Sequence, residues 1–242
     1  KANDIIPKIV RVTDRPSQRQ PIPVPSACPF CGGEVGRKVT TSGTEGAILA
    51  CRNRACPQKS IGKIARWIKS LDILGIGDAV LEALVEHFAI EDAGDLYTLR
   101  DQAEAMAELI INPEKELRLG AKRATSILAA IDATRTLRLS QFLGALGIEA
   151  LGQRRVELMI AAAGGDLDRL DDWRGGTLRD PALAARAGVP NLGGPIQDAI
   201  DALAPVMDKL LANGVEILPP AEDLHATPNG ARQTLCISGR LP

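Results

Sequence analysis

Apolar residues follow a helical period along most of the chain from residue 60 to residue 212. In the stretch 60–70, for example, Ile64, Trp67 and Ile68 fall on one face of a helix. The pattern predicts amphipathic helices at 60–70, 78–88, 101–111, 122–134, 139–146, 153–163, 181–187 and 195–212. The fold class expected from this pattern is mainly α.

A short turn motif recurs between the predicted helices. It consists of an apolar residue, a glycine and the start of a helix, and its glycines stand at positions 77, 120, 152 and 193, at intervals of 43, 32 and 41 residues. The positions four and seven residues after each glycine are apolar in three copies, whereas the fourth copy has Gln197 at the first of them. Such a period favours an array of repeats. The alternative is an ordinary helical bundle that needs glycines at its turns.

The first copy, Gly75-Ile76-Gly77, has two glycines, which let the backbone turn sharply and approach another surface closely. Because a helix begins behind the turn, its first N–H groups and the positive end of its dipole point outward and favour phosphate. Lys122 and Arg154 each follow a turn glycine by two residues and would add positive charge. The candidate phosphate-binding residues are Gly75, Gly77, Gly120, Lys122, Gly152, Arg154 and Gly193.

Four cysteines precede the helices with the spacing C-x2-C-x19-C-x4-C. Two thiol pairs on two turns can surround one zinc ion as a tetrahedron, so Cys28, Cys31, Cys51 and Cys56 are candidate metal ligands. A short β-hairpin is expected between the pairs, within residues 34–50. The alternative is two disulfides, but no secretory signal is recognisable and we expect zinc. Basic residues around the cysteines could contact phosphate, although a purely structural module fits them equally well.

Charge is distributed unevenly along the 242 residues. Residues 1–70 contain 13 Lys and Arg against 4 Asp and Glu, whereas residues 71–242 contain 16 against 26. A basic front part favours a polyanionic partner. The acidic remainder does not exclude DNA, because backbone N–H groups can bind phosphate without many cations. No apolar run approaches the roughly 18 residues of a membrane span, so no membrane partner is expected.

Both ends of the chain are predicted to contain strands rather than helices. Residues 1–12 are expected to form one strand interrupted at Pro7, followed by a proline-rich linker over 14–27. A second linker covers 213–231, and a new strand follows at 234–241. A lone strand is not a fold, so we interpret the chain as a piece of a longer protein.

The turn motif resembles a helix-hairpin-helix motif, and the order of all these elements resembles the C-terminal half of a bacterial NAD-dependent DNA ligase. The stretch 4–8 is similar to the end of that family's OB-fold domain, and the four cysteines match its zinc finger. The stretch 142–152 resembles its third helix-hairpin-helix repeat, and 235–241 the first strand of its BRCT domain.

The resemblance implies a domain organisation. The fold class would be a tandem helix-hairpin-helix domain after a small four-cysteine zinc finger, with strand remnants at both ends. The expected segments are the end of an OB-fold domain (1–20), the zinc finger with its proline-rich lead-in (21–58), the four-repeat helix-hairpin-helix domain (59–213), a linker (214–231) and the start of a BRCT domain (232–242).

The resemblance also implies a function. The family seals nicks in duplex DNA during replication and repair, using NAD and Mg²⁺, with the adenylated lysine in an upstream nucleotidyltransferase domain. This chain has no Lys-x-Asp-Gly motif, so we expect it to be non-catalytic alone, to contain zinc and to bind nicked duplex DNA without sequence preference. We also expect a monomer in the bacterial cytoplasm, associated with the nucleoid. The alternatives are a non-enzymatic zinc and helix-hairpin-helix module, part of a repair nuclease, or a structural bundle that binds protein.

Overall fold

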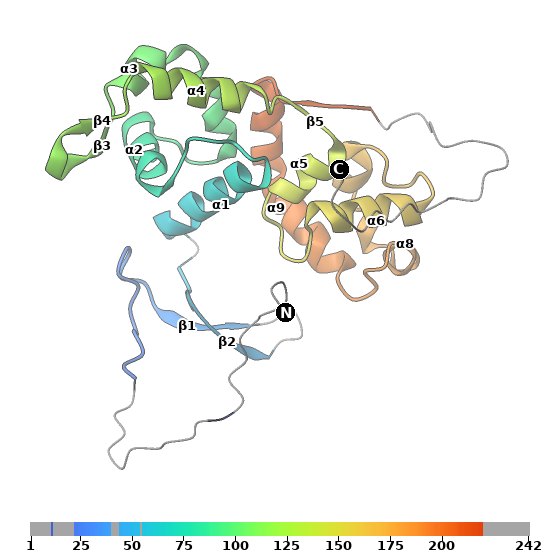
Figure 1. Ribbon diagram of the computed structural model, residues 1–242. Helices are drawn as coiled ribbons and strands as arrows, with labels where there is room; N and C mark the ends of the chain where they lie inside the picture. Colours follow the sequence, from blue (N-terminus) through green and yellow to red (C-terminus); the bar gives the residue numbers. More distant parts are fainter. Residues whose placement is uncertain (1–10, 12–21, 40–43, 54, 220–242) are drawn as a thin grey trace, which may run out of the picture. The chain divides into compact units, whose positions relative to one another are not determined.

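Figure 1 shows the computed structural model, which describes residues 11, 22–39, 44–53 and 55–219. The chain divides into two compact units, Lys1–Cys56 and Pro57–Pro242, and each is described by itself. Apart from residue 11, which is not in a strand, the stretches 1–12 and 234–241 where strands are expected lie outside the described residues. The described part is mainly α-helical, as the sequence pattern predicts. Within it, no helix combines the length and the apolar character that a membrane crossing requires.

The first unit is built on one antiparallel hairpin. Strand β1 (Val35–Val39) pairs with β2 (Glu45–Cys51), in a register that places Val35 opposite Cys51 and Arg37 opposite Leu49. This confirms the hairpin expected within residues 34–50. Its tip, residues 40–43, lies outside the described residues.

The second unit consists of helices joined by short turns and by two two-stranded pairings, β3 with β4 and β5 with β6. The α-helices are α1 (Pro57–Ser70), α2 (Asp78–Phe88), α3 (Ala103–Ala107), α4 (Ala121–Asp132), α5 (Leu139–Ala145), α6 (Gln153–Ala163), α7 (Leu170–Arg174), α8 (Pro181–Arg186) and α9 (Gly193–Ala212). The remaining elements are the 3₁₀ segments η1 (Ala93–Asp101), η2 (Pro113–Lys115) and η3 (Thr177–Arg179), and the strands β3 (Ile110–Asn112), β4 (Leu117–Arg118), β5 (Thr136–Leu137) and β6 (Glu216–Ile217).

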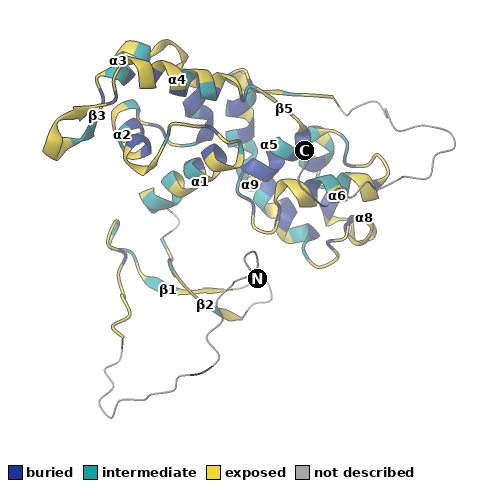
Figure 2. Ribbon diagram, viewed as in Figure 1, coloured by how far each residue is buried: buried dark blue, intermediate teal, exposed yellow. Residues whose placement is uncertain are grey.

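The repeat seen in the sequence corresponds to pairs of helices that meet across a turn. Helix α1 contacts α2, α3 contacts α4, and α5 contacts α6. Figure 2 shows that the buried positions gather on the inner faces of these helices. The residues four and seven positions after the turn glycines are all buried in one core: Leu81, Leu84, Ala124, Ile127, Val156, Met159, Gln197 and Ile200.

Gln197 is the one polar residue among these repeat positions, and it is fully buried with its hydrogen bonds satisfied. Its amide nitrogen donates to the Trp173 carbonyl at 2.9 Å and to Asp201 Oδ1 at 2.8 Å, and its amide oxygen accepts from the Leu178 N–H at 3.3 Å. A buried amide without partners would cost stability, whereas this one fixes the loop before α8 against α9.

A buried polar network joins the first two repeats. The Trp67 indole of α1 donates to the Tyr97 hydroxyl at 3.2 Å, and that hydroxyl lies 2.8 Å from Thr134 Oγ1 after α4. The Arg135 guanidinium stacks over the Tyr97 ring at 5.3 Å and donates to the Tyr97 carbonyl. Trp67 also meets Phe142 of the third repeat edge-on, at 5.9 Å between ring centroids.

The chain returns to this network after α9. Strand β6 pairs in parallel with β5, which follows α4, and Lys209 Nζ of α9 lies 3.0 Å from Asp92 Oδ2 and 2.7 Å from Asp95 Oδ1 at the start of η1. The fourth repeat is therefore tied back to the segment between the first and second repeats.

The prediction of a helix at 101–111 is wrong for the second half of this stretch. Helix α3 ends at Ala107, and Ile110–Asn112 pairs instead with Leu117–Arg118 as a small hairpin. Pro113 follows this strand and disfavours helix in the residue before it. The Asn112 side chain caps the turn by accepting from the Lys115 N–H at 3.1 Å.

The third turn adopts a strained conformation that suggests a stability test. Ala150 occupies the place that Gly75 has in the first turn, and both have positive φ, 62° and 92°. Because this region favours glycine, Ala150→Gly should raise the free energy of unfolding by about 1 kcal/mol. Ala133 is also exposed but has φ −62° at the end of α4. Ala133→Gly should therefore lower the free energy of unfolding by roughly 0.5–1 kcal/mol. Chemical denaturation followed by helical circular dichroism measures both, and equal shifts would refute the conformational argument.

Candidate metal centre and nucleic-acid interface

The β-hairpin and two tight turns bring the four cysteines together. Cys28 and Cys31 lie on the turn before β1, where the Cys28 N–H donates to the Gly33 carbonyl at 2.7 Å. Cys51 ends β2, and Cys56 follows after a turn in which the Ala55 N–H donates to Asn53 Oδ1 at 3.0 Å. All four Sγ atoms lie within 4.8 Å of one another.

The sulfur separations fit a metal rather than disulfides. Cys28 Sγ lies 3.9 Å from Cys56 Sγ, and Cys31 Sγ lies 3.6 Å from Cys51 Sγ. A disulfide would need about 2.05 Å, and none of these four cysteines forms one. Zinc–sulfur bonds of about 2.3 Å in a tetrahedron place sulfurs about 3.8 Å apart. The cluster is therefore compatible with one zinc ion.

Small and polar neighbours shape the sulfur cluster. A Cβ at Gly33 would lie 2.8 Å from Asn53 Cβ and 3.3 Å from Cys31 Sγ, so only glycine fits there without a shift. The Asn53 side-chain amide lies 3.5 Å from Cys31 Sγ as a donor. Such neighbours orient the thiols around the position of a metal.

The pKa of the Cys31 thiol is lowered and that of the Cys51 thiol is raised, because their surroundings differ. Hydrogen bonding from the Gly33 backbone, and then from the Asn53 amide, lowers the pKa of Cys31 to about 6. Desolvation raises the pKa of Cys51 to about 11, and the nearby Cys31 sulfur adds to this. Two thiolates this close repel each other, and a bound dication would favour the deprotonated form of both.

In the second unit, three of the five predicted turn glycines lie at open helix starts. Gly77, Gly120 and Gly152 are exposed N-cap residues of α2, α4 and α6, and no side chain caps these helices. A Cβ built at any of the three would meet no atom within 4 Å. Gly77 and Gly152 have φ −89° and −90°, so backbone conformation does not explain the glycine there.

The other two glycines serve close packing. Gly75 has φ 92°, and a Cβ there would lie 2.9 Å from Ile127 Cγ1 of α4. Gly193 is buried, and a Cβ there would collide with the Leu178 carbonyl oxygen and lie 2.8 Å from Ala184 Cβ. The fourth turn glycine is therefore enclosed by protein.

Positive charge is concentrated at two of the open helix starts. Lys122 and Arg154 are exposed in the first turns of α4 and α6, and Arg154 lies 3.4 Å from Glu157. Arg123 and Arg155 are exposed beside them, so each start carries two adjacent cations. Sequence reasoning missed Arg123 and Arg155, which stand three residues after Gly120 and Gly152. Helix α2 has Asp78 at its start instead.

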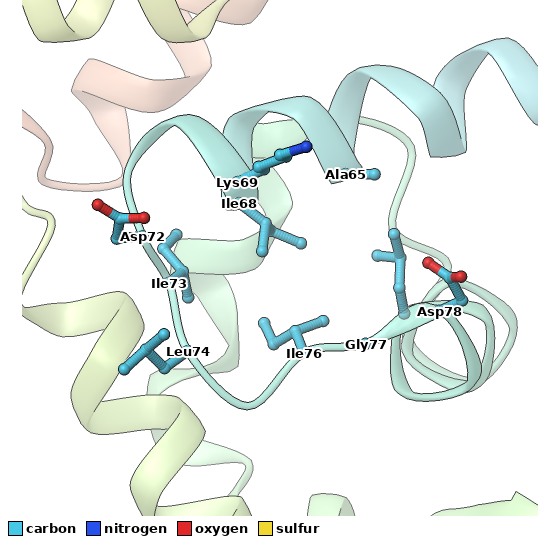
Figure 3. Close-up of a pocket in the computed structure, with 10 residues that line it drawn as sticks. Ala65, Ile68, Lys69, Asp72, Ile73, Leu74, Ile76, Gly77 and Asp78 are labelled. Atoms are coloured by element: carbon cyan, nitrogen blue, oxygen red, sulfur yellow. The ribbon is translucent and has the colours of Figure 1, made fainter. Parts of the chain in front are cut away.

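A hollow of about 370 Å³ lies beside the first turn, and the sequence did not predict it. It lies between the end of α1 and the start of α2, with Ile68, Ile73 and Leu81 among its apolar lining. Figure 3 shows Ile76, between the two glycines, directed toward Ile68 across this hollow. Ile76 is partly buried against the core.

The chain has clear relatives among known proteins, although no family model matches it. It is 32% identical to a DNA ligase of Symbiobacterium thermophilum over the whole chain, which covers 34% of that protein. It is 36% identical to a DNA ligase of Pseudomonas paraeruginosa, over 70% of the chain and 22% of that protein. It is 34% identical to a "DNA ligase 2" of Deinococcus deserti, over 70% of the chain and 23% of that protein. It thus spans about a third or less of the length of the relatives it matches. We conclude that the chain belongs to the DNA ligase family.

Proposed function

We propose that this chain is the C-terminal DNA-binding part of an NAD-dependent DNA ligase, which seals nicks in duplex DNA during replication and repair. The observation that carries the proposal is the set of three exposed, uncapped helix starts at Gly77, Gly120 and Gly152. The ligase names of the relatives support DNA as the partner.

Phosphate binding at these starts follows from the geometry of a helix. The first N–H groups of α2, α4 and α6 have no partner within their helix, and the helix dipole places a partial positive charge there. The open space in place of a Cβ lets a phosphate oxygen approach the backbone. Such contacts carry no base information, so the binding is sequence-independent.

The second and third repeats contribute most of the charge to this surface. Lys122 with Arg123, and Arg154 with Arg155, can make charge-assisted contacts beside the amides of their own helices. We leave Gly193 out of the surface because its packing against Leu178 and Ala184 already requires glycine.

The four-cysteine module holds one zinc ion in this proposal. Four thiolates complete a tetrahedron and leave no open position for a water or a substrate, so the ion stabilises the fold of the first unit. The NAD and Mg²⁺ chemistry belongs to the upstream nucleotidyltransferase domain of the longer protein, and we assign no catalytic residue to this chain. The protein acts as a monomer in the bacterial cytoplasm, at the nucleoid.

Zinc content is the first test. Metal analysis of chain purified without chelator should find one zinc ion, and Cys51→Ser should release it, because binding can contribute on the order of 10 kcal/mol to folding. Circular dichroism should show helices 57–212 largely retained, since they have their own core. Cys236→Ser, which changes a cysteine outside the cluster spacing, should keep the ion. Absence of zinc from the unaltered chain would refute the assignment.

The salt dependence of DNA binding tests the proposed phosphate contacts. Each phosphate neutralised by a cation contributes about −0.9 to the slope of log affinity against log salt. Replacing Lys122 and Arg154 together by glutamine should flatten the slope for a nicked duplex by about two units. Arg100→Gln is the control, because Arg100 acts on Asp132 at the opposite end of α4. A slope unchanged in the double variant would contradict the assignment.

A carboxylate at the third turn tests the open glycine directly. Gly152→Asp fits without collision, and aspartate in place of glycine at an N-cap stabilises a helix by about 0.3 kcal/mol. The melting temperature should therefore hold or rise while nicked-duplex affinity falls, by more than on losing Lys122 or Arg154 alone. Gly194→Asp adds the same charge at the start of α9 and should leave binding nearly unchanged. Full affinity in Gly152→Asp would show that the glycine has no role in binding.

A further inference from the structure

Two exposed leucines stand at equivalent places in the first and second turns. Leu74 precedes Gly77 by three residues, and Leu117 precedes Gly120 by three. Their exposed fractions are 74% and 50%, whereas the leucines directly before Gly120 and Gly152, Leu119 and Leu151, are buried. The third and fourth turns have Glu149 and Pro190 at this place. The leucines are therefore a shared feature of the first two repeats that core packing does not explain.

The first turn packs against helix α4, and the second turn leads directly into this helix. Gly75, next to Leu74, lies against Ile127 of α4, and Leu117 lies in β4, just before α4 begins. The seven residues from Gly120 to Ile127 span about 10 Å along the helix. Figure 3 shows Leu74 leaving the first turn in a different direction from Ile76, which is directed toward Ile68. Leu74 and Leu117 are thus two apolar turn residues fixed to one rigid element.

Each leucine lies next to a helix start whose free amides favour a polyanion, and cations accompany only Leu117, because α2 begins with Asp78. Leu74 precedes the uncapped start of α2, and Leu117 precedes the uncapped start of α4 with Lys122 and Arg123. An apolar side chain beside free amides suits a partner with an apolar interior between two rows of phosphates. The minor groove of duplex DNA, about 6 Å wide and walled by deoxyribose, has this chemistry.

We propose that Leu74 and Leu117 enter the minor groove and pack against deoxyribose and base edges, while the amides behind them bind the flanking phosphates. Apolar side chains serve this purpose in other minor-groove proteins. The inference rests on the proposed DNA-binding function and adds its apolar component. A leucine forms no hydrogen bond with a base edge, so the contact adds affinity without sequence preference.

The salt dependence separates this component from the phosphate contacts. Burial of apolar surface releases no condensed counterions, so it changes affinity equally at every salt concentration. Loss of a leucine should therefore shift the line of log affinity against log salt downward without changing its slope. Loss of Lys122 or Arg154 should change the slope.

The test compares Leu74→Ala, Leu117→Ala and the double variant of this 242-residue chain on a nicked duplex over a range of salt. Each single change should weaken binding about tenfold, as expected for a leucine that becomes largely buried, with the slope unchanged. Leu158→Ala is the matched control, because Leu158 is 53% exposed on α6 and lies outside the turns. Circular dichroism should show every variant folded, since none of these side chains is buried.

Wild-type affinity in the folded double variant would overturn the proposal. So would a flattened slope, because the leucines would then act only by misplacing the cations. Sedimentation of the same proteins tests whether a second copy of the chain, rather than DNA, packs against the two leucines. A wild-type dimer that the double variant abolishes, with duplex affinity unchanged, would make the leucines a self-association surface instead. Failure of the unaltered chain to bind any duplex would instead refute the proposed function itself.

Discussion

The second and third turns depend on burying the apolar residue directly before the turn glycine, whereas Ile76 and Leu192 at the same place in the first and fourth turns are partly buried. Leu119 and Leu151 are 3% and 0% exposed, and the glycines that follow them are open to solvent. The buried side chain holds the turn to the core, while the glycine leaves the helix start uncovered. Backbone groups of α4 and α6 are thereby exposed at fixed positions, although their first turns form no side-chain cap. The same constraint stabilises the fold and creates the proposed phosphate sites.

The four repeats use this constraint differently. The fourth buries its glycine against Leu178 and keeps Gln197 at a core position by satisfying its amide. Its helix is tied back to η1 through Lys209. The first repeat combines an acidic helix start at Asp78 with the exposed Leu74, and the second and third provide paired cations. We interpret the fourth repeat as support for a surface that the first three form.

Sequence predicted the features that depend on local pattern. Helices α2 and α6 begin and end where the apolar period places them, and the cysteine spacing identified the sulfur cluster. Features that depend on tertiary contact were not predictable. Gly193 and Gly152 both follow a leucine and precede a helix, and although Gln197 sets the fourth copy apart in sequence, only the structure shows that Leu178 and Ala184 enclose Gly193. The small hairpin after α3 replaced a predicted helix because strand pairing, which no local period reveals, overrode helical propensity.

Hydrogen exchange of the backbone amides, with and without a nicked duplex, tests the central claim most directly. It observes the amides themselves and requires no substitution. The account predicts slower exchange in the first turns of α2, α4 and α6 when DNA is bound, with the first turn of α9 unaffected. DNA binding without slower exchange at these three helix starts would show that the chain contacts the duplex through another surface.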